Sequence, residues 1–391
     1  MLTDPMALAI ALIAIAVAIY AISLIPILQG FFTYFPPVVW MYFVPMALST
    51  WGVLPAEHPL YSTLAKYALP MALILLTLST DVKAIASIGL PGLLALLAGS
   101  LGVVLGSVVA FLMLSGWLPE DVWQGFVMLS ASWIGGSANL VAMQQSLEVD
   151  PSLVGPVVVV DTVVGYSWLG LLIVLSAQQR GINKLLKADL TSLDQVEAQL
   201  IESSKDASLV SVRSISIMVG ASLVAAFLAR AFAESLPELG SPRIITATTW
   251  TILVSVSGGL LLSITRLGAA ARRHQAPEYA YAALFLLLVT VGAQADLRAI
   301  ANAPTFLLAG LVILTIHIVC LVLVCRMLRL PAFFFAVGSM CSIGGAVSGP
   351  IAAAAYRPAL APVGALLGVA GYVIGIYLPL GLAFLLSSLA T

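Results

Sequence analysis

The sequence predicts an all-α, polytopic membrane protein, and three observations lead to this fold class. Of the 391 residues, 61% are hydrophobic and only 8% are charged, whereas a soluble domain has roughly 25% charged residues. The apolar residues lie in runs of about 20, the length of a helix that crosses a bilayer. These runs do not alternate with polar residues, so they are not barrel strands. Because only helices and closed barrels satisfy their backbone groups in lipid, helices remain.

About 11 to 12 transmembrane helices are expected, and a proline lies near most of the breaks between them. The apolar segments lie at residues 5–28, 38–54, 59–80, 87–115, 122–146, 152–176, 213–233, 243–264, 277–294, 302–326, 332–355 and 360–388. One connection differs, since residues 178–213 hold ten charged residues. The sequence therefore divides into a first membrane repeat (1–177), a polar linker (178–212) and a second membrane repeat (213–391).

The distribution of cations predicts the orientation of the chain. If every apolar segment crosses the membrane, the loops at 178–213, 265–276 and 326–330 lie on the same side of it. Together with Lys66, these loops hold eleven of the sixteen Lys and Arg. The positive-inside rule makes that face cytoplasmic. We therefore expect a multi-pass protein of the cell (inner or plasma) membrane, with the loop at 178–212 in the cytoplasm. Tryptophans Trp117, Trp123 and Trp133 around the fifth segment are interpreted as anchors at the membrane interface.

Four markers recur in the same order in the two halves, which indicates an internal repeat. Asp81-Val82-Lys83 matches Asp296-Leu297-Arg298, and each motif follows an apolar segment that begins near a tyrosine. Each half then has a Leu/Gly-rich segment, an Ile-Gly-Gly segment and a final segment with Gly-Tyr. The simpler interpretation of Asp-x-Lys/Arg is that it anchors a helix end at the membrane interface. The four markers indicate a repeat even if this interpretation is correct.

The two Ile-Gly-Gly steps are expected to break their helices and to form a binding site. Broken helices in corresponding segments point to a transporter's site, because a break frees backbone groups and glycine lets a ligand approach them. Ser137 or Asn139 could cap the second half-helix of the first copy, and Pro350 is expected at the first helical position in the second copy. The simpler alternative is close helix packing, which is also the interpretation of Gly102/Gly106, Gly364/Gly368 and Gly371/Gly375. The residues expected to contact a solute are Ser132, Gly135, Gly136, Ser137, Asn139, Ser342, Gly344, Gly345 and Ser348.

Three residues are candidates for ion coupling: Asp161, Asn139 and His317. Asp161 lies in an apolar run with no cation nearby in sequence, and a carboxylate at the bilayer centre costs about 2.5–3.5 kcal/mol on insertion scales. It could bind Na⁺ or carry a proton, or it could pair with a cation from another helix. His317 could relay protons, or it could bond to a neighbouring helix. Apart from a Na⁺ site at Asp161, no metal and no cofactor are expected.

The chain has the motif Asp-[Val/Leu]-[Lys/Arg] after the third helix, and it has an interrupted Gly-Gly-Ser-x-Asn helix before a helix that carries an aspartate. In these features it resembles the domain of unknown function 819 family. That family is grouped with the cation/proton antiporters and the bile-acid sodium symporters. The resemblance implies inverted repeats, a core domain of crossed broken helices that moves against a scaffold, and an acid at the place of Asp161 that carries the coupling ion. Counting crossings instead places both glycine breaks in the same orientation. Either one segment does not fully cross, or the repeats are not inverted.

The expected function is a secondary active transporter of a small anionic organic solute, coupled to Na⁺ or H⁺ and working by elevator-type alternating access. The alternatives are a cation/proton antiporter without an organic substrate and a membrane-embedded binding or scaffold protein. An enzyme is not expected, because no hydrolase, phosphate-loop or metalloprotease motif is present. The expected partners are the bilayer and a small-molecule solute, with homodimerisation left open. The net charge of -1 argues against a nucleic-acid partner.

Overall fold

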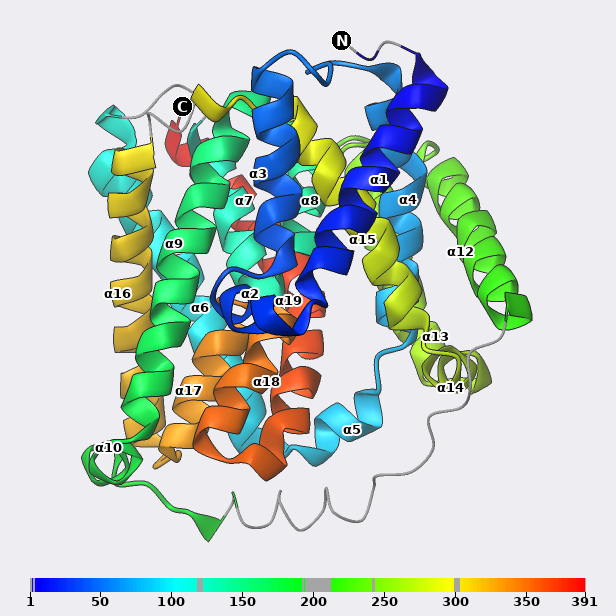
Figure 1. Ribbon diagram of the computed structural model, residues 1–391. Helices are drawn as coiled ribbons and strands as arrows, with labels where there is room; N and C mark the ends of the chain where they lie inside the picture. Colours follow the sequence, from blue (N-terminus) through cyan, green and yellow to red (C-terminus); the bar gives the residue numbers. More distant parts are fainter. Residues whose placement is uncertain are drawn as a thin grey trace. The chain divides into compact units, whose positions relative to one another are not determined.

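The computed structural model describes residues 4–117, 122–191, 212–240, 243–298 and 303–390, together with Leu2 and Leu193. Within these ranges the chain is helical, apart from turns and one isolated bridge between Leu239 and Ile245 (Figure 1). Eight of the described helices are long and apolar enough to cross a membrane, or up to ten if each of two bent pairs counts as one span. The predicted all-α, polytopic membrane fold is confirmed. The helices are α1 (Pro5–Ser23), α2 (Gln29–Tyr34), α3 (Pro37–Thr50), α4 (Pro59–Leu78), α5 (Val82–Ser87), α6 (Gly89–Leu114), α7 (Val122–Gly135), α8 (Ser137–Ser146), α9 (Pro151–Ser176), α10 (Gln179–Leu186), α12 (Val212–Ala233), α13 (Ala247–Ser263), α14 (Arg266–Arg273), α15 (Ala276–Gln294), α16 (Ala303–Met327), α17 (Ala332–Cys341), α18 (Gly345–Tyr356) and α19 (Ala361–Ala390).

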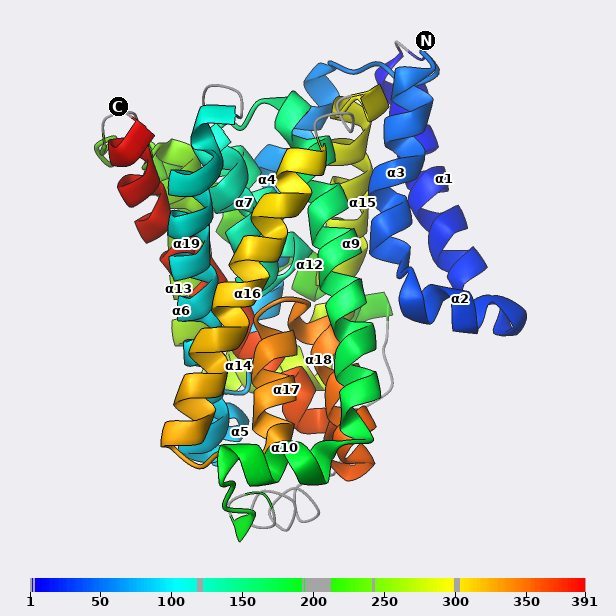
Figure 2. The same ribbon diagram turned by 90° about the vertical axis from the view of Figure 1, so that its left-hand side faces the viewer.

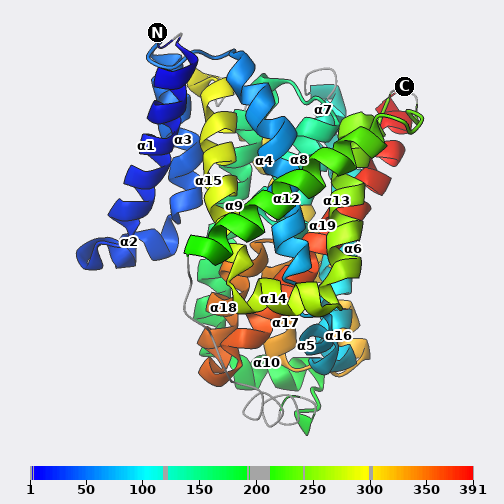
Figure 3. The ribbon, with the colours of Figure 1, turned by 90° about the vertical axis from the view of Figure 1, so that its right-hand side faces the viewer.

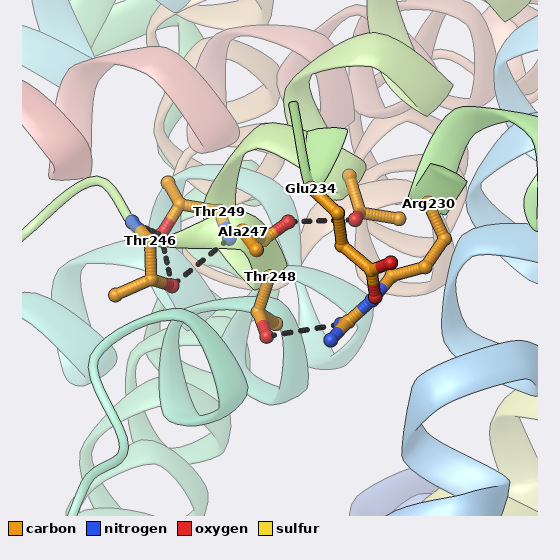
Figure 4. Close-up of polar contacts among 7 residues, drawn as sticks. Arg230, Glu234, Thr246, Ala247, Thr248 and Thr249 are labelled. Carbon is orange, nitrogen blue, oxygen red and sulfur yellow. Dashed lines mark hydrogen bonds and ion pairs between the residues drawn. The ribbon is translucent and has the colours of Figure 1, made fainter. Parts of the chain in front are cut away.

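Polar side chains at the segment ends start several helices. The Asp81 carboxylate accepts a hydrogen bond from the Ala84 N–H at 2.9 Å and so caps α5. Thr246 caps α13 in a capping box with Thr249, beside the Arg230–Glu234 ion pair of α12 (Figure 4). The first residue of the Asp81-Val82-Lys83 motif therefore caps a helix, and its anchoring role at the membrane interface stays a prediction.

The chain forms two compact units, and each unit takes segments from both predicted repeats. Unit 1 comprises Met1–Ser79, Val141–Thr162 and Ser208–Phe306, and unit 2 comprises Thr80–Leu140, Val163–Ala207 and Leu307–Thr391. The division into repeats at 1–177 and 213–391 describes order along the chain and stays a prediction. Of the polar linker predicted at 178–212, residues 192 and 194–211 lie outside the described residues.

Unit 1 is a bundle in which α4 packs against α12, α13 and α15, while α15 also packs against α3 and α1 (Figure 3). A close approach fixes the α3–α15 pair, because a Cβ on Gly292 would lie 2.4 Å from the Tyr42 carbonyl oxygen. In the most apolar stretches of α1 and α12, only 22% and 17% of the residues are buried. Their exposed apolar surfaces suit contact with lipid tails.

Unit 2 contains α6, α7, α16, α17, α18 and α19, with α19 packed against α7, α18 and α6 (Figure 2). Gly102 and Gly106 allow α6 to lie against α16, since a Cβ on either would come within 2.8 Å of backbone atoms of His317 or Ile313. The packing role predicted for this glycine pair is confirmed.

The segment at 332–355 is broken at Ile343-Gly344-Gly345, as expected, into helices α17 and α18, and these fold back on each other. Helices α17 and α18 pack side by side in the same half of unit 2 and are joined at their inner ends (Figure 2). Helix α7 begins at the end of unit 2 where α6 finishes, while α17 begins at the opposite end, beside α10. Helices α6 and α16 also run in opposite directions (Figure 2). These opposite directions are the ones an inverted repeat requires; the repeat itself stays a prediction.

Candidate functional site

The two Ile-Gly-Gly steps, separated by about 200 residues, meet inside unit 2. Gly136 has φ +84° and Gly345 has φ +60°, and both values fall in the left-handed region that glycine adopts without steric cost. A Cβ on Gly345 would lie 3.3 Å from the Gly136 Cα. The backbones of the two breaks therefore touch, as a shared site would need.

Helix α19 runs along both breaks through a row of glycines, Gly364, Gly368, Gly371 and Gly375. A Cβ on Gly371 would lie 2.7 Å from the Ile134 carbonyl oxygen and 3.1 Å from that of Cys341. A Cβ on Gly375 would lie 2.7 Å from the Gly135 nitrogen. Gly371 thus sits between the C-terminal ends of α7 and α17, and the packing role predicted for these glycines is confirmed.

The second half of the first break starts at a glycine. Helix α8 begins at Ser137, and the Gly136 carbonyl oxygen accepts hydrogen bonds from the Asn139 and Leu140 N–H groups at 2.9 and 3.3 Å. Gly136 therefore stands at the cap position that was expected for Ser137 or Asn139. The Asn139 side chain is directed elsewhere, to α19.

The second half of the other break also starts earlier than predicted. Helix α18 begins at Gly345 with Gly344 as its cap, and Pro350 lies inside the helix. The expectation that Pro350 opens α18 is wrong, because Gly345 supplies the left-handed turn that lets the chain reverse before the proline. The first turns of α8 and α18 both lie where the breaks meet. Their first N–H groups lack an intrahelical acceptor and carry partial positive charge.

Three polar groups of residues close in sequence to the breaks are fully buried and have no hydrogen-bond partner among the described residues: Asn139 Oδ1, Ser348 Oγ and Trp133 Nε1. The other side of Asn139 is satisfied, since Nδ2 donates to the Tyr372 carbonyl oxygen at 2.9 Å. Buried polar groups almost always have a partner, and each one left without costs about 1–3 kcal/mol. One donor, one acceptor and one hydroxyl are thus available to a polar ligand.

Trp133 was expected to anchor the membrane interface, and that interpretation is wrong. Its side chain is 0% exposed, and Trp123 is also buried, whereas Trp117 is 76% exposed. Of these three tryptophans, Trp117 alone has the exposure of an interface anchor. The sequence did contain a sign that Trp133 is buried, because this residue lies one position before Ile134-Gly135-Gly136, inside the break segment and away from its ends.

The remaining predicted serines differ in their surroundings. The Ser342 hydroxyl lies 2.9 Å from the Gly338 carbonyl oxygen and 3.2 Å from that of Leu96, so it ties α17 to α6. Ser132 is buried and Ser137 is half-buried. Of the predicted serines, Ser348 is the one whose hydroxyl is buried and unpartnered among the described residues.

His317 connects several helices of unit 2. Its Nδ1 lies 2.8 Å from the Gly99 carbonyl oxygen, and its Nε2 lies 2.7 Å from the Ser339 hydroxyl, which also accepts from Trp168 Nε1 at 2.8 Å. Because a carbonyl oxygen only accepts, Nδ1 donates to Gly99, and neutral Nε2 accepts from Ser339. Both ring nitrogens are thus satisfied, which favours the structural interpretation of His317. Its ion-coupling role stays a prediction.

Asp161 belongs to unit 1, whereas the breaks belong to unit 2. The carboxylate is partly exposed and interacts electrostatically with the buried Tyr42 of α3. Helix α9 continues from Asp161 into unit 2 at Val163. Among the described residues, no three His, Cys, Asp or Glu side chains gather as a metal site would require. The coupling role of Asp161 stays a prediction.

Comparison with known proteins places the chain in a family. A family described as "Protein of unknown function (DUF819)" matches residues 10–389. The chain belongs to the DUF819 family. It is also 28% identical over 346 residues to the "Uncharacterized membrane protein YjcL" of Bacillus subtilis (strain 168), which covers 85% of each chain. This DUF819 protein is therefore similar over most of its length to a membrane protein, in agreement with its apolar helices.

Proposed function

We propose that this DUF819 protein is a secondary active transporter of a small anionic organic solute, coupled to Na⁺ or H⁺. The observation that carries the proposal is the meeting of the α8 and α18 N-termini together with three buried, unpartnered polar groups of the described residues. The many apolar helices of the described chain also fit a membrane transporter. Half-helix N-termini inside a membrane protein are suited to anionic substrate groups.

The solute's carboxylate would be held by groups of complementary polarity. The first N–H groups of α8 and α18 donate, and each helix terminus favours an anion by about 0.3–1 kcal/mol. Trp133 Nε1 and Ser348 Oγ add two donors, and Asn139 Oδ1 accepts from a hydroxyl or amino group of the solute or ligates the coupling cation. This set favours a small acid with a second polar group over a purely apolar ligand.

The division into two units supports elevator-type alternating access. Both breaks lie in unit 2, and the chain passes between the units at five points, after residues 79, 140, 162, 207 and 306. We propose that unit 2 carries the bound solute as a body while unit 1 serves as the scaffold. Asp161, two residues before α9 enters unit 2, would bind the coupling ion.

Ser348→Ala is the sharpest test of the site. Since Ser348 Oγ has no partner among the described residues, its removal should leave the apparent Tm of the solute-free protein unchanged or raised. Loss of a hydrogen bond to a charged ligand costs about 1.5–3 kcal/mol, so the affinity for the solute should fall about 10- to 100-fold. Ser222→Ala in α12, which removes bonds only within its own helix, is the matched control.

The solute is sought by thermal stabilisation against a panel of organic acids, each with and without Na⁺. A ligand present at 100 times its Kd should stabilise the folded protein by about 2.7 kcal/mol. Uptake of the best ligand into proteoliposomes is then measured for wild type and Asp161→Asn under imposed Na⁺ and H⁺ gradients. Uptake by Asp161→Asn that follows the gradient as wild type does would exclude coupling at Asp161. Ligand binding without uptake would favour a binding or scaffold protein.

The second candidate is a cation/proton antiporter without an organic substrate. The observation that favours it is Asp161, a carboxylate in the middle of the apolar helix α9. Vesicles that contain the protein and a pH-sensitive dye distinguish the two. Na⁺-driven proton movement with no organic acid present supports the antiporter, and movement that requires an organic acid supports the symporter.

A further inference from the structure

Helix α10 lies across the ends of α9, α16 and α17 at one end of unit 2 (Figure 2). It is fastened there by two bonds to other helices. Asn183 Oδ1 accepts from the Ala332 N–H, the first of α17, at 2.7 Å, and the Arg326 guanidinium donates to the Leu185 carbonyl oxygen. Helix α10 is therefore held at the level where spanning helices end, and it runs across them.

This end of unit 2 is strongly cationic. Exposed side chains on α10, at its C-cap and at the end of α16 contribute five cations, namely Arg180, Lys184, Lys187, Arg326 and Arg329. Within residues 178–191 and 323–330 the one carboxylate is Asp189. Hydrogen bonds from Thr191, and then the charge of Arg329, hold the pKa of that carboxyl below its ordinary value.

Large apolar side chains are exposed among these cations. Leu185 is 62% exposed, Met327 is 79% exposed and Leu328 is 47% exposed. A surface that mixes arginine and lysine with exposed leucine and methionine matches the boundary between lipid headgroups and acyl chains. A water-facing surface gains nothing from the apolar residues, and a tail-facing surface would not accommodate the cations.

We propose that the α10 surface, formed by α10 with its C-cap Lys187 and by Arg326–Arg329, binds the headgroups of anionic phospholipids. The cations attract the phosphate groups, each contributing on the order of a five-fold gain in affinity. Leu185, Met327 and Leu328 enter the adjoining acyl region. The bond between Asn183 and the start of α17 links this lipid contact to the hairpin that carries Gly345. The proposal does not depend on transport activity.

The competing occupant is the chain's own segment 194–206, whose sequence carries four acids, Asp194, Glu197, Glu202 and Asp206. It lies outside the described residues. An acidic segment would pair with the cations, but it offers no reason for the exposed leucine and methionine beside them. The anionic lipid accounts for both features.

The test is competition between phosphatidylglycerol and phosphatidylcholine with the same acyl chains, scored by native mass spectrometry of the full-length protein. The test variant is Arg180→Gln/Lys184→Gln/Lys187→Gln, which leaves Asn183 and Arg326 in place. The matched control removes three exposed cations of unit 1: Lys66→Gln/Arg243→Gln/Arg298→Gln. Circular dichroism confirms that each variant is folded. A further variant neutralises the four acids of segment 194–206.

Wild type and the control should bind phosphatidylglycerol selectively, and the α10 variant should lose about 100-fold in affinity, from three charges at about five-fold each. Equal selectivity in the α10 variant and the control would overturn the proposal. The proposal would also be overturned if the wild type showed no selectivity for phosphatidylglycerol and became selective when the four acids of 194–206 were neutralised. In that case segment 194–206 would occupy the α10 surface in the wild type.

Discussion

Replacing Gly371 with alanine should separate the two breaks and destabilise unit 2. The new Cβ would lie 2.7 Å from the Ile134 carbonyl oxygen and 3.1 Å from that of Cys341. Both obstacles are backbone atoms that cannot rotate away, so α7, α17 or α19 must shift by several tenths of an ångström. Overpacking of this kind costs about 1–3 kcal/mol. Thermal unfolding of the purified protein in detergent measures it, with solute uptake as a second readout.

The matched control is Gly170→Ala in α9. A Cβ at Gly170 meets nothing within 4 Å among the described residues, and alanine is the better helix former by about 1 kcal/mol. The control should therefore have the same or a higher Tm, and Gly371→Ala a lower one. Equal unfolding temperatures for the two variants would refute the close approach of α19 to the ends of α7 and α17.

Three further predictions follow from local geometry. Ser339→Ala leaves the buried His317 and Trp168 without their shared hydroxyl partner and should lower the free energy of unfolding by about 1–3 kcal/mol; an unchanged Tm would contradict the network. Pro350→Ala restores an N–H inside α18 and should raise the Tm, whereas a lower Tm would mean that α18 does start at Pro350. Hydrogen bonds from Ser152 hold the pKa of Asp150 below its ordinary value of 3.8. The ionised Asp150 therefore stabilises the folded protein above pH 3.8, and this stabilisation is lost as the pH falls through the lower pKa of the folded state. Asp150→Asn should remove that part of the acid dependence, as a pH series of Tm values would record.

The fold class and the position of the breaks could be predicted because both depend on local sequence. Composition and run length select membrane helices, and Gly135-Gly136 and Gly344-Gly345 permit the left-handed turns at Gly136 and Gly345. The hairpin at α17 and α18 could not be predicted in the same way. A run of about 24 apolar residues with a glycine break has the same length and hydropathy whether it crosses or folds back, and contacts with α19 decide the direction of the second arm.

The burial of Trp133 and the division into two units also required the tertiary structure. Tryptophan is common at membrane interfaces, so residue type alone favours an anchor, while the packing of α7 in unit 2 buries the ring. The units interleave the two halves of the chain, which no linear feature of the sequence records. Asp161 was conspicuous by its charge, yet its assignment to unit 1 depends on where α9 passes from one unit to the other.

The row of glycines on α19 has a mechanical consequence. At Gly364, Gly371 and Gly375, α19 lies against backbone atoms of α7, α17 and α18, and the Asn139 side chain adds a hydrogen bond to the Tyr372 carbonyl oxygen. The breaks are therefore held to α19 mainly by close backbone contacts, and these contacts leave no room for a side chain in the glycine row. A side chain placed at any position of that row would push α19 away from the breaks, so substitution can weaken this contact one position at a time.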